Sequence, residues 1–182
     1  MNKILLYVAF SLIVFNVGAQ NRFFTKDAKI NFNSSTSVED IIAESNQATT
    51  FIDIEKNEVA FSVLTTSFKF RRALMEEHFN ENYMESAKFP KAKFSGKITT
   101  QIDWKSEKQV IADVKGQLTM HGMTKEVAFK AQITPGKGKI AAVAELKVTP
   151  EEFAIPIPSA VRDKIAKEVT IKIDAVYNPY QP

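Results

Sequence analysis

The chain has 182 residues, contains no cysteine and carries a formal net charge of +3. This length suits one domain with a sizeable core, and the missing cysteine excludes a disulfide framework, thiol catalysis and cysteine-ligated metal. Because basic and acidic residues are nearly equal in number, the charge does not indicate nucleic-acid binding.

The first 19 residues have the pattern of a secretory signal peptide. A short basic start, which ends at Lys3, precedes an apolar segment at residues 4–17 and small residues up to Ala19. The apolar segment is too short for a comfortable membrane span of about 20 residues. We therefore expect cleavage near Ala19, a mature domain over residues 20–182, a periplasmic or secreted location and no stable membrane span. An uncleaved anchor is the alternative.

Alternation of apolar and polar residues predicts strands with one dry face and one wet face. The two clearest runs, residues 94–104 and 110–120, are each roughly 36 Å long when extended. That is long for a globular strand, for which roughly 3–10 residues are usual. In chain order the eight predicted strands are residues 28–34, 49–54, 58–66, 94–104, 110–120, 125–134, 139–149 and 168–177.

The segments between the strands carry turn and helix signals. His121-Gly122 separates two strands as a tight hairpin does, and residues 135–138 contain two glycines and a proline. Residues 71–84 break the alternation and predict a short amphipathic helix, with a second helical turn at residues 159–167. The apolar face of the first helix carries Leu74, Met75, His78, Phe79 and Tyr83.

These elements predict an all-β fold, an eight-stranded antiparallel lipocalin-like barrel with one short amphipathic helix. Short links favour up-and-down order, and closure removes exposed sheet edges. The interior of such a barrel is either packed solid or holds one small ligand. The inward phase mixes large residues with small ones such as Gly96, Ala112 and Gly116, so a packed interior and an open tube are both consistent with the pattern, and these small residues are where we expect room in a tube.

Two central blocks resemble the YceI-like family of bacterial polyisoprenoid-binding proteins. Residues 74–98 read LMEEHFNENYMESAKFPKAKFSGKI, with an acidic-His-Phe run and then an aromatic-Pro pair before a strand. Residues 116–129 read GQLTMHGMTKEVAF, which is similar to the family's hairpin. The closing stretch, residues 153–173, has a similar pattern.

The resemblance implies a binding protein without catalysis, located in the periplasm. Its barrel would be a tube that encloses the tail of a long-chain isoprenoid or similar amphiphilic lipid, with the head near a mouth. The resemblance implies no cofactor other than such a bound isoprenoid or fatty-acid-like lipid. The expected partner is this amphiphilic lipid, with no nucleic acid; a homodimer is left open.

Alternation and the helix pattern together nominate the residues that would line the lipid channel. Alternation gives the face of each strand but not the depth of each residue. The candidate ligand-binding residues are Phe32, Phe61, Val63, Phe70, Leu74, His78, Phe79, Phe94, Ile98, Val114, Leu118 and Phe129.

The two histidines favour different roles. His121 precedes Gly122 in a turn, and histidine is enriched among non-glycine residues at positive φ, so a structural role is expected. For His78 we expect a buried, hydrogen-bonded side chain, the alternative being contact with a lipid head at the mouth. No HExxH spacing or third ligand indicates a metal site. Arg71 and Arg72 either form a solvated start of the helix or attract an acidic head group at the rim of the barrel.

Two other functions stay open at this point. A filled barrel would suit a structural or interaction module of the cell envelope. An enzyme acting on a lipid in the tube would need His78 or Glu77 as its acid–base group.

Overall fold

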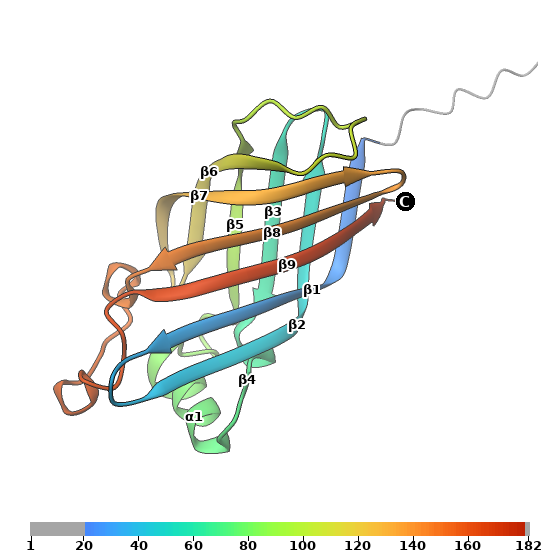
Figure 1. Ribbon diagram of the computed structural model, residues 1–182. Helices are drawn as coiled ribbons and strands as arrows, with labels where there is room; N and C mark the ends of the chain where they lie inside the picture. The colour runs from blue at the N-terminus through green and yellow to red at the C-terminus, as the bar shows by residue number, and fades with distance from the viewer. Residues whose placement is uncertain (1–20, 181–182) are drawn as a thin grey trace, which may run out of the picture.

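The computed structural model describes residues 21–180, which form one closed antiparallel barrel with a short helix at one end (Figure 1). Eight long strands make the barrel, so the predicted fold class is confirmed. The predicted signal peptide, residues 1–19, lies outside the described residues.

The strands follow one another around the barrel in an order close to that of the sequence. Hydrogen-bonded neighbours run β1-β9-β8-β7-β6-β5-β3-β2, and β1 also pairs with β2. The elements are β1 (Arg22–Ser35), β2 (Asp40–Asp53), β3 (Glu58–Leu64), η1 (Thr65–Ser67), β4 (Lys69–Phe70), α1 (Ala73–His78), η2 (Phe79–Tyr83), β5 (Lys91–Ile98), β6 (Val110–Met120), β7 (Met123–Gly136), β8 (Lys139–Val148), η3 (Pro150–Phe153), η4 (Ser159–Val161) and β9 (Val169–Pro179).

Strand β1 closes the barrel because it pairs on both sides. It runs antiparallel to β2 from Arg22↔Asp53 to Ser35↔Asp40, and antiparallel to β9 on its other edge. Its register with β2 shifts on either side of Ala28. Such bulges bend a strand and increase its twist, which lets a 14-residue strand follow the curved wall.

The two ends of the barrel differ. At one end the 99–109 loop contributes Ile102, which is buried, and Trp104, which packs against the core. We call the opposite end the mouth: it is formed by the β1–β2 hairpin, α1 with η2, the β6–β7 turn and the connection from β8 to β9. Figure 1 shows α1 beside the β1–β2 hairpin, far from the 99–109 loop.

Several strand boundaries differ from the sequence-based prediction. The first two strands begin at Arg22 and Asp40, well before the predicted starts at residues 28 and 49. The predicted strand over residues 94–104 is wrong at its end, because β5 stops at Ile98. The side chain and carbonyl of Asp103 accept hydrogen bonds from the backbone N–H groups of Lys105 and Ser106, which bends the chain into a turn.

The predicted helix over residues 71–84 is shorter and less regular in the structure. It is α-helical only from Ala73 to His78 and then widens into the π-helical turn η2. Asn80 supports this wider turn, since its side-chain amide donates to the carbonyl of Glu76 at 2.9 Å. The second predicted helical turn is confirmed only as the three-residue η4.

The turn predictions are confirmed by the backbone angles. His121 and Gly122 have φ values of 50° and 75° and join β6 to β7, while Gly138 has a φ of 74° between β7 and β8. A two-residue hairpin turn with positive φ at both positions matches the twist of its strands.

Two glycines face each other where β5 and β6 approach closely. Gly96 pairs with Gly116, and a Cβ added at Gly116 would lie 2.4 Å from the carbonyl oxygen of Ser95. The Phe94 ring lies against both glycines. The absence of side chains therefore allows the close approach of the two strands.

We expect Gly116→Ala to destabilise the protein, because backbone atoms cannot move aside as a flexible side chain can. The expected loss is about 1–3 kcal/mol in the free energy of unfolding, measured by urea denaturation. The matched control is Gly136→Ala, whose added Cβ would lie 3.3 Å from the Lys139 oxygen and whose effect should stay within about 0.5 kcal/mol. Equal effects of the two substitutions would contradict this account.

Candidate ligand-binding site

A cavity of about 500 Å³ occupies the interior of the barrel. Every strand and α1 contribute to its wall, and along β5 it extends from Ala92 to Ile98, which is roughly 20 Å. Its volume falls within the roughly 300–1,000 Å³ that is usual for small-molecule sites. The interior of this barrel is therefore open.

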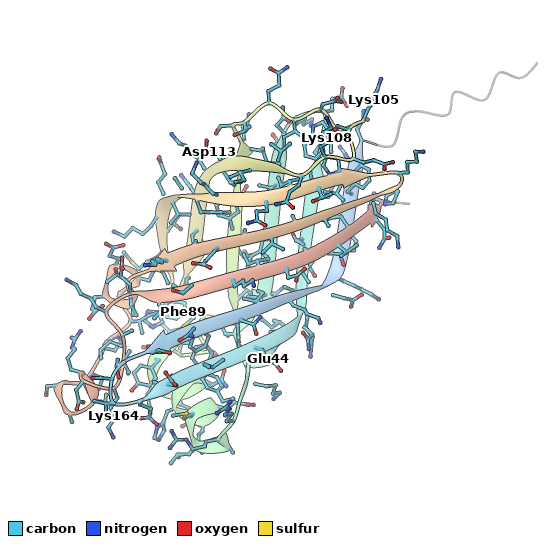
Figure 2. The ribbon with its side chains drawn as sticks, viewed as in Figure 1. Glu44, Phe89, Lys105, Lys108, Asp113 and Lys164 are labelled. Atoms are coloured by element: carbon cyan, nitrogen blue, oxygen red, sulfur yellow. The ribbon has the colours of Figure 1, made fainter. Side chains whose placement is uncertain are left out.

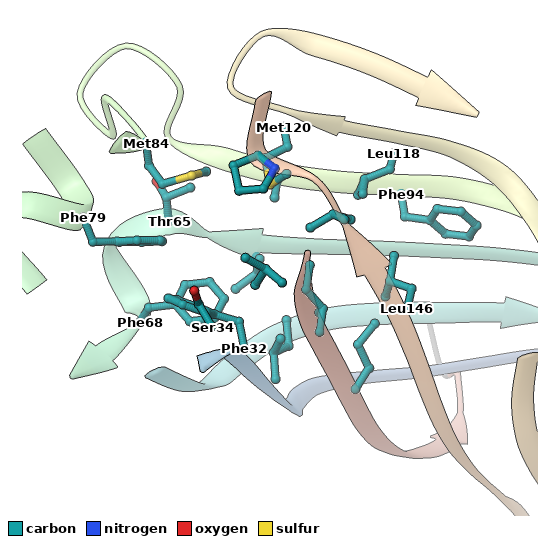
Figure 3. A pocket seen from close by; sticks show the side chains of 18 of the residues that line it. Phe32, Ser34, Thr65, Phe68, Phe79, Met84, Phe94, Leu118, Met120 and Leu146 are labelled. Carbon is teal, nitrogen blue, oxygen red and sulfur yellow. The ribbon is translucent and has the colours of Figure 1, made fainter. Parts of the chain in front are cut away.

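The wall of the cavity is apolar over most of its length. Figure 3 shows Phe32, Phe68 and Phe79 together on one side of the pocket, with Leu118 and Leu146 further along it. Aliphatic side chains of β6 to β9 make most of the remaining wall. Such a surface suits a hydrocarbon chain, which offers no hydrogen-bonding groups.

All twelve residues nominated from the sequence line this cavity, although their contact with a ligand is still a prediction. Ten of them face the interior from the strands or from η2. Leu74 and His78 lie at the mouth on α1 and are exposed, Leu74 by 59%. The twelve are Phe32, Phe61, Val63, Phe70, Leu74, His78, Phe79, Phe94, Ile98, Val114, Leu118 and Phe129.

The room in the cavity does not come from the residues that the sequence suggested. Gly96, Ala112 and Gly116 lie outside its lining, because the Phe94 ring covers the two glycines and Ala112 is fully buried. The small residues that do line it are Ala92, Ala131, Ala142 and Ala144. The expectation for the glycines was wrong because alternation cannot tell which inward residues a neighbouring ring will cover.

Four phenylalanines gather between the cavity and the mouth. Phe79 of η2 stacks on Phe32 of β1, with ring centroids 5.4 Å apart, and also contacts Phe68 and Phe70 at 5.8 and 5.0 Å. The π-helical turn turns Phe79 toward these rings. This aromatic cluster forms part of the cavity wall next to the mouth.

The few polar groups deep in the wall bond to one another or to the backbone. The hydroxyl of Thr50 donates to the carbonyl of Ala60 at 2.9 Å, so it accepts a hydrogen bond from the Tyr177 hydroxyl 3.0 Å away. Nearer the mouth, the Ser34 hydroxyl accepts the backbone N–H of Ala166 at 2.8 Å. These bonds remove any demand for a polar ligand group in the interior.

The Thr50–Tyr177 pair was missed by the sequence analysis. Tyr177 continues the inward phase of Ile171, Ile173 and Ala175, so alternation could have placed it, while nothing in the sequence links it to Thr50. Burial raises the pKa of Tyr177 to about 12, although its hydrogen bond with Thr50 acts in the opposite direction.

The two histidines lie in different environments. His121 is buried, and its Nδ1 lies 3.1 Å from the carbonyl oxygen of Phe153, so its ring holds η3 against the β6–β7 turn. Its Nε2 has no hydrogen-bond partner and lies 3.5 Å from the Glu85 carboxylate. The structural role predicted for His121 is confirmed. The buried position predicted for His78 is wrong, because α1 presents that side chain at the open mouth.

Neither a metal cluster nor a membrane-spanning helix occurs among residues 21–180. No group of three His, Asp or Glu side chains is placed to hold a metal ion in this part of the chain. None of the described helices has the length and apolar character needed to cross a membrane.

The fold and its interior define a lipocalin-like barrel whose apolar cavity is the candidate site. The family model described as "YceI-like domain" matches residues 16–177. The chain therefore belongs to the YceI-like family, which confirms the resemblance found in the sequence.

Curated relatives match a part of the chain. A UPF0312 protein of Pseudomonas fluorescens (strain SBW25) is 38% identical over 86 residues, and one of Pseudomonas putida (strain GB-1) is 36% identical over 86 residues. Each match covers 47% of this chain and 42% of the relative. This chain thus matches less than half the length of those relatives.

Solved structures share the fold over most of the chain at low identity. A polyisoprenoid binding domain from Saccharophagus degradans gives a TM-score of 0.74 at 12% identity, covering 88% of this chain and 99% of that chain. Burkholderia cenocepacia BcnA gives 0.70 at 15% identity, covering 82% and 95%. A Campylobacter jejuni YCEI protein gives 0.57 at 15% identity and covers both chains fully.

We expect the burial of Tyr177 to make stability depend on pH in alkaline solution. Its pKa of about 12 in the folded protein exceeds the ordinary value of 10.0. Between these pH values the unfolded chain has lost the proton that the folded protein keeps, so the free energy of unfolding falls as the pH rises. The slope is about 1.4 kcal/mol per pH unit, and the total about 3 kcal/mol.

The matched variant for this test is Tyr177→Phe, which removes the hydroxyl but keeps the ring. Urea denaturation of both proteins between about pH 9 and 12 isolates the Tyr177 contribution as the difference between their unfolding free energies. This difference should be constant below pH 10. Above pH 10 the unfolding free energy of the wild type should fall relative to that of Tyr177→Phe. A difference that is independent of pH would contradict the assignment.

Proposed function

We propose that this protein binds a long-chain isoprenoid or a similar amphiphilic lipid, with the tail inside the barrel and the polar head at the mouth. The single observation that carries the proposal is the apolar cavity of about 500 Å³, which is open at the mouth and carries charged side chains only there. The polyisoprenoid binding domain of Saccharophagus degradans, which shares this fold, supports an isoprenoid as the first ligand to test.

The free energy of burying a lipid tail makes such a site effective without specific polar contacts. Each buried methylene contributes about 0.8 kcal/mol, so ten enclosed carbons would contribute about 8 kcal/mol before the costs of association and ordering. Selectivity in this cavity would come from the length and width of the tail, because its deep polar groups already have partners.

The same cavity bears on the two alternative functions. A filled barrel that acts only through its outer surface is disfavoured, since the interior has room for a ligand. For an enzyme, His78 or Glu77 would have to face a lipid in the tube, but both are exposed and Glu77 lies outside the lining. Binding without catalysis fits these positions best.

The proposal includes a periplasmic or secreted location. It rests on the basic, apolar and small-residue pattern of residues 1–19. N-terminal sequencing of the protein recovered from its native host would test the expected processing near Ala19. A mature protein that still begins at Met1 would contradict it.

The direct test of the function is extraction followed by titration. Protein purified without detergent is extracted with organic solvent, and mass spectrometry identifies any co-purified lipid. The extracted protein is then titrated with geranylgeraniol, an isoprenoid alcohol, by following tryptophan fluorescence or by calorimetry. The absence of both a co-purified lipid and measurable uptake would overturn the proposal.

A cavity-filling variant links the binding to the barrel interior. Ala144 of β8 lines the cavity, and Ala144→Phe should weaken geranylgeraniol binding about tenfold or more, or by at least about 1.4 kcal/mol. The control is Ala141→Phe on the same strand, because Ala141 is exposed on the outer face. Thermal unfolding of each variant verifies that the barrel is intact. Equal affinity in the two variants would contradict an interior site.

A further inference from the structure

Formal charge in the cavity lining is confined to the mouth. The charged residues of the lining are Glu39, Arg72 and Lys164, with His78 beside them on α1. All of them belong to the hairpin, the helix region or the 149–168 connection. Figure 2 shows Lys164 at this end of the barrel, far from Lys105 and Lys108 at the other. A ligand that enters tail-first would therefore meet charge only at its head.

Two of these charges neutralise each other. The guanidinium of Arg72 forms an ion pair with the carboxylate of Glu39, which ties the β1–β2 hairpin to the segment before α1. Arg72 is the more exposed partner, with 63% of its side chain accessible against 21% for Glu39. A guanidinium has five N–H donors, so Arg72 keeps donors for a further acceptor at the mouth.

Lys164 is the lining cation whose charge is not matched in this way. Two nearby acidic groups already have basic partners, because Glu151 pairs with Arg162 and Glu168 pairs with Lys147 of β8. Within residues 21–180, the Lys164 ammonium makes no ion pair, and its neighbour Asp163 lies outside the cavity lining. The net charge of the lining at the mouth is thus positive.

The backbone around Lys164 is held in place at the mouth. Its N–H donates to the carbonyl of Val161 at 3.0 Å, and two residues later the N–H of Ala166 donates to the hydroxyl of Ser34. Ser34 is only 2% exposed and belongs to the wall of the cavity. The lysine therefore extends from a backbone position that is fixed relative to the cavity.

We propose that the mouth selects lipids with an anionic oxygen head group, a carboxylate or a phosphate, and that Lys164 is the main determinant of this preference. This inference rests on the proposed function and adds to it the chemical class of the ligand's head group. An oxyanion at the mouth accepts a hydrogen bond from the Lys164 ammonium and faces the free donors of Arg72. A neutral alcohol gains no comparable charge-assisted bond.

The test compares three ligands that share one tail. Geranylgeranyl monophosphate, geranylgeranoic acid and geranylgeraniol differ only in a phosphate, carboxylate or hydroxyl head. At low salt the two anions should bind the wild-type protein about five- to tenfold more tightly than the alcohol. The preference should shrink at about 0.5 M sodium chloride, because salt screens exposed charges.

Substitutions of two lysines, one at each end of the barrel, locate the effect. Lys164→Glu should abolish the anion preference, measured in each variant as the ratio of the affinities for the anions and for geranylgeraniol, and Lys164→Gln should reduce that ratio. The control, Lys105→Glu, alters the overall charge equally but lies at the closed end. It should keep the full preference.

The outcomes separate the two proposals. If none of the three ligands binds, the proposed function fails. If all three bind equally well to the wild type, the lipid site stands and the anionic head group is overturned. A preference that survives in Lys164→Glu, or that is lost equally in Lys105→Glu, would overturn the role of Lys164. Inorganic phosphate alone should neither bind measurably nor compete, and competition by it would contradict a site that needs the tail.

Discussion

The pairing of β1 with both β9 and β2 is the constraint on which the rest of this structure depends. An open sheet of strands this long would leave two edges of unpaired backbone groups and a large apolar face in water. Closure pairs the backbone groups of both edges, and it directs the apolar face into the barrel interior. The bulges around Ala28 supply the curvature, and the buried interior is the consequence.

Closure alone does not decide whether the interior is solid. In this barrel the answer depends on local packing around the wall. Gly96 and Gly116 bring β5 and β6 together, and Phe94 covers them, so that part of the wall is filled. Ala131 and Ala144, which pair across β7 and β8, present only methyl groups to the interior. The space that they leave is part of the cavity, because no large neighbouring side chain occupies it.

The sequence predicted the fold well where one face is consistently apolar. Strand β6 matches the predicted residues 110–120, since every inward residue from Val110 to Met120 is either apolar or glycine. The first half of β2 was missed because, after Ile41, its inward residues are the small Ala43, Ser45 and Ala48, which give no clear apolar alternation. Burial there is imposed by the neighbouring strands and the segment after β3, which are distant in sequence. Such a context is invisible to a local pattern.

In the candidate site too, alternation predicts which face of a strand a residue lies on but not how deeply that residue is buried. Alternation placed the nominated strand residues on the inward face, and they line the cavity. It could not place Lys164, which lies in a connection outside the strands, or foresee that His78 would be exposed. Those positions follow from how the helix and the 149–168 connection fold over the mouth, and that arrangement depends on single contacts such as Ala166 with Ser34.

The difference between the two ends gives the barrel a direction. At the closed end, Ile102 and Trp104 pack against the core and present no charge to the cavity. At the mouth, an aromatic cluster stands between charged side chains and the apolar interior. An amphiphile that inserted head-first would lose the hydration of its head in a wall whose polar groups are already bonded, whereas tail-first insertion buries only hydrocarbon. The polarity of the lining therefore favours one orientation of the ligand, with the head at the mouth.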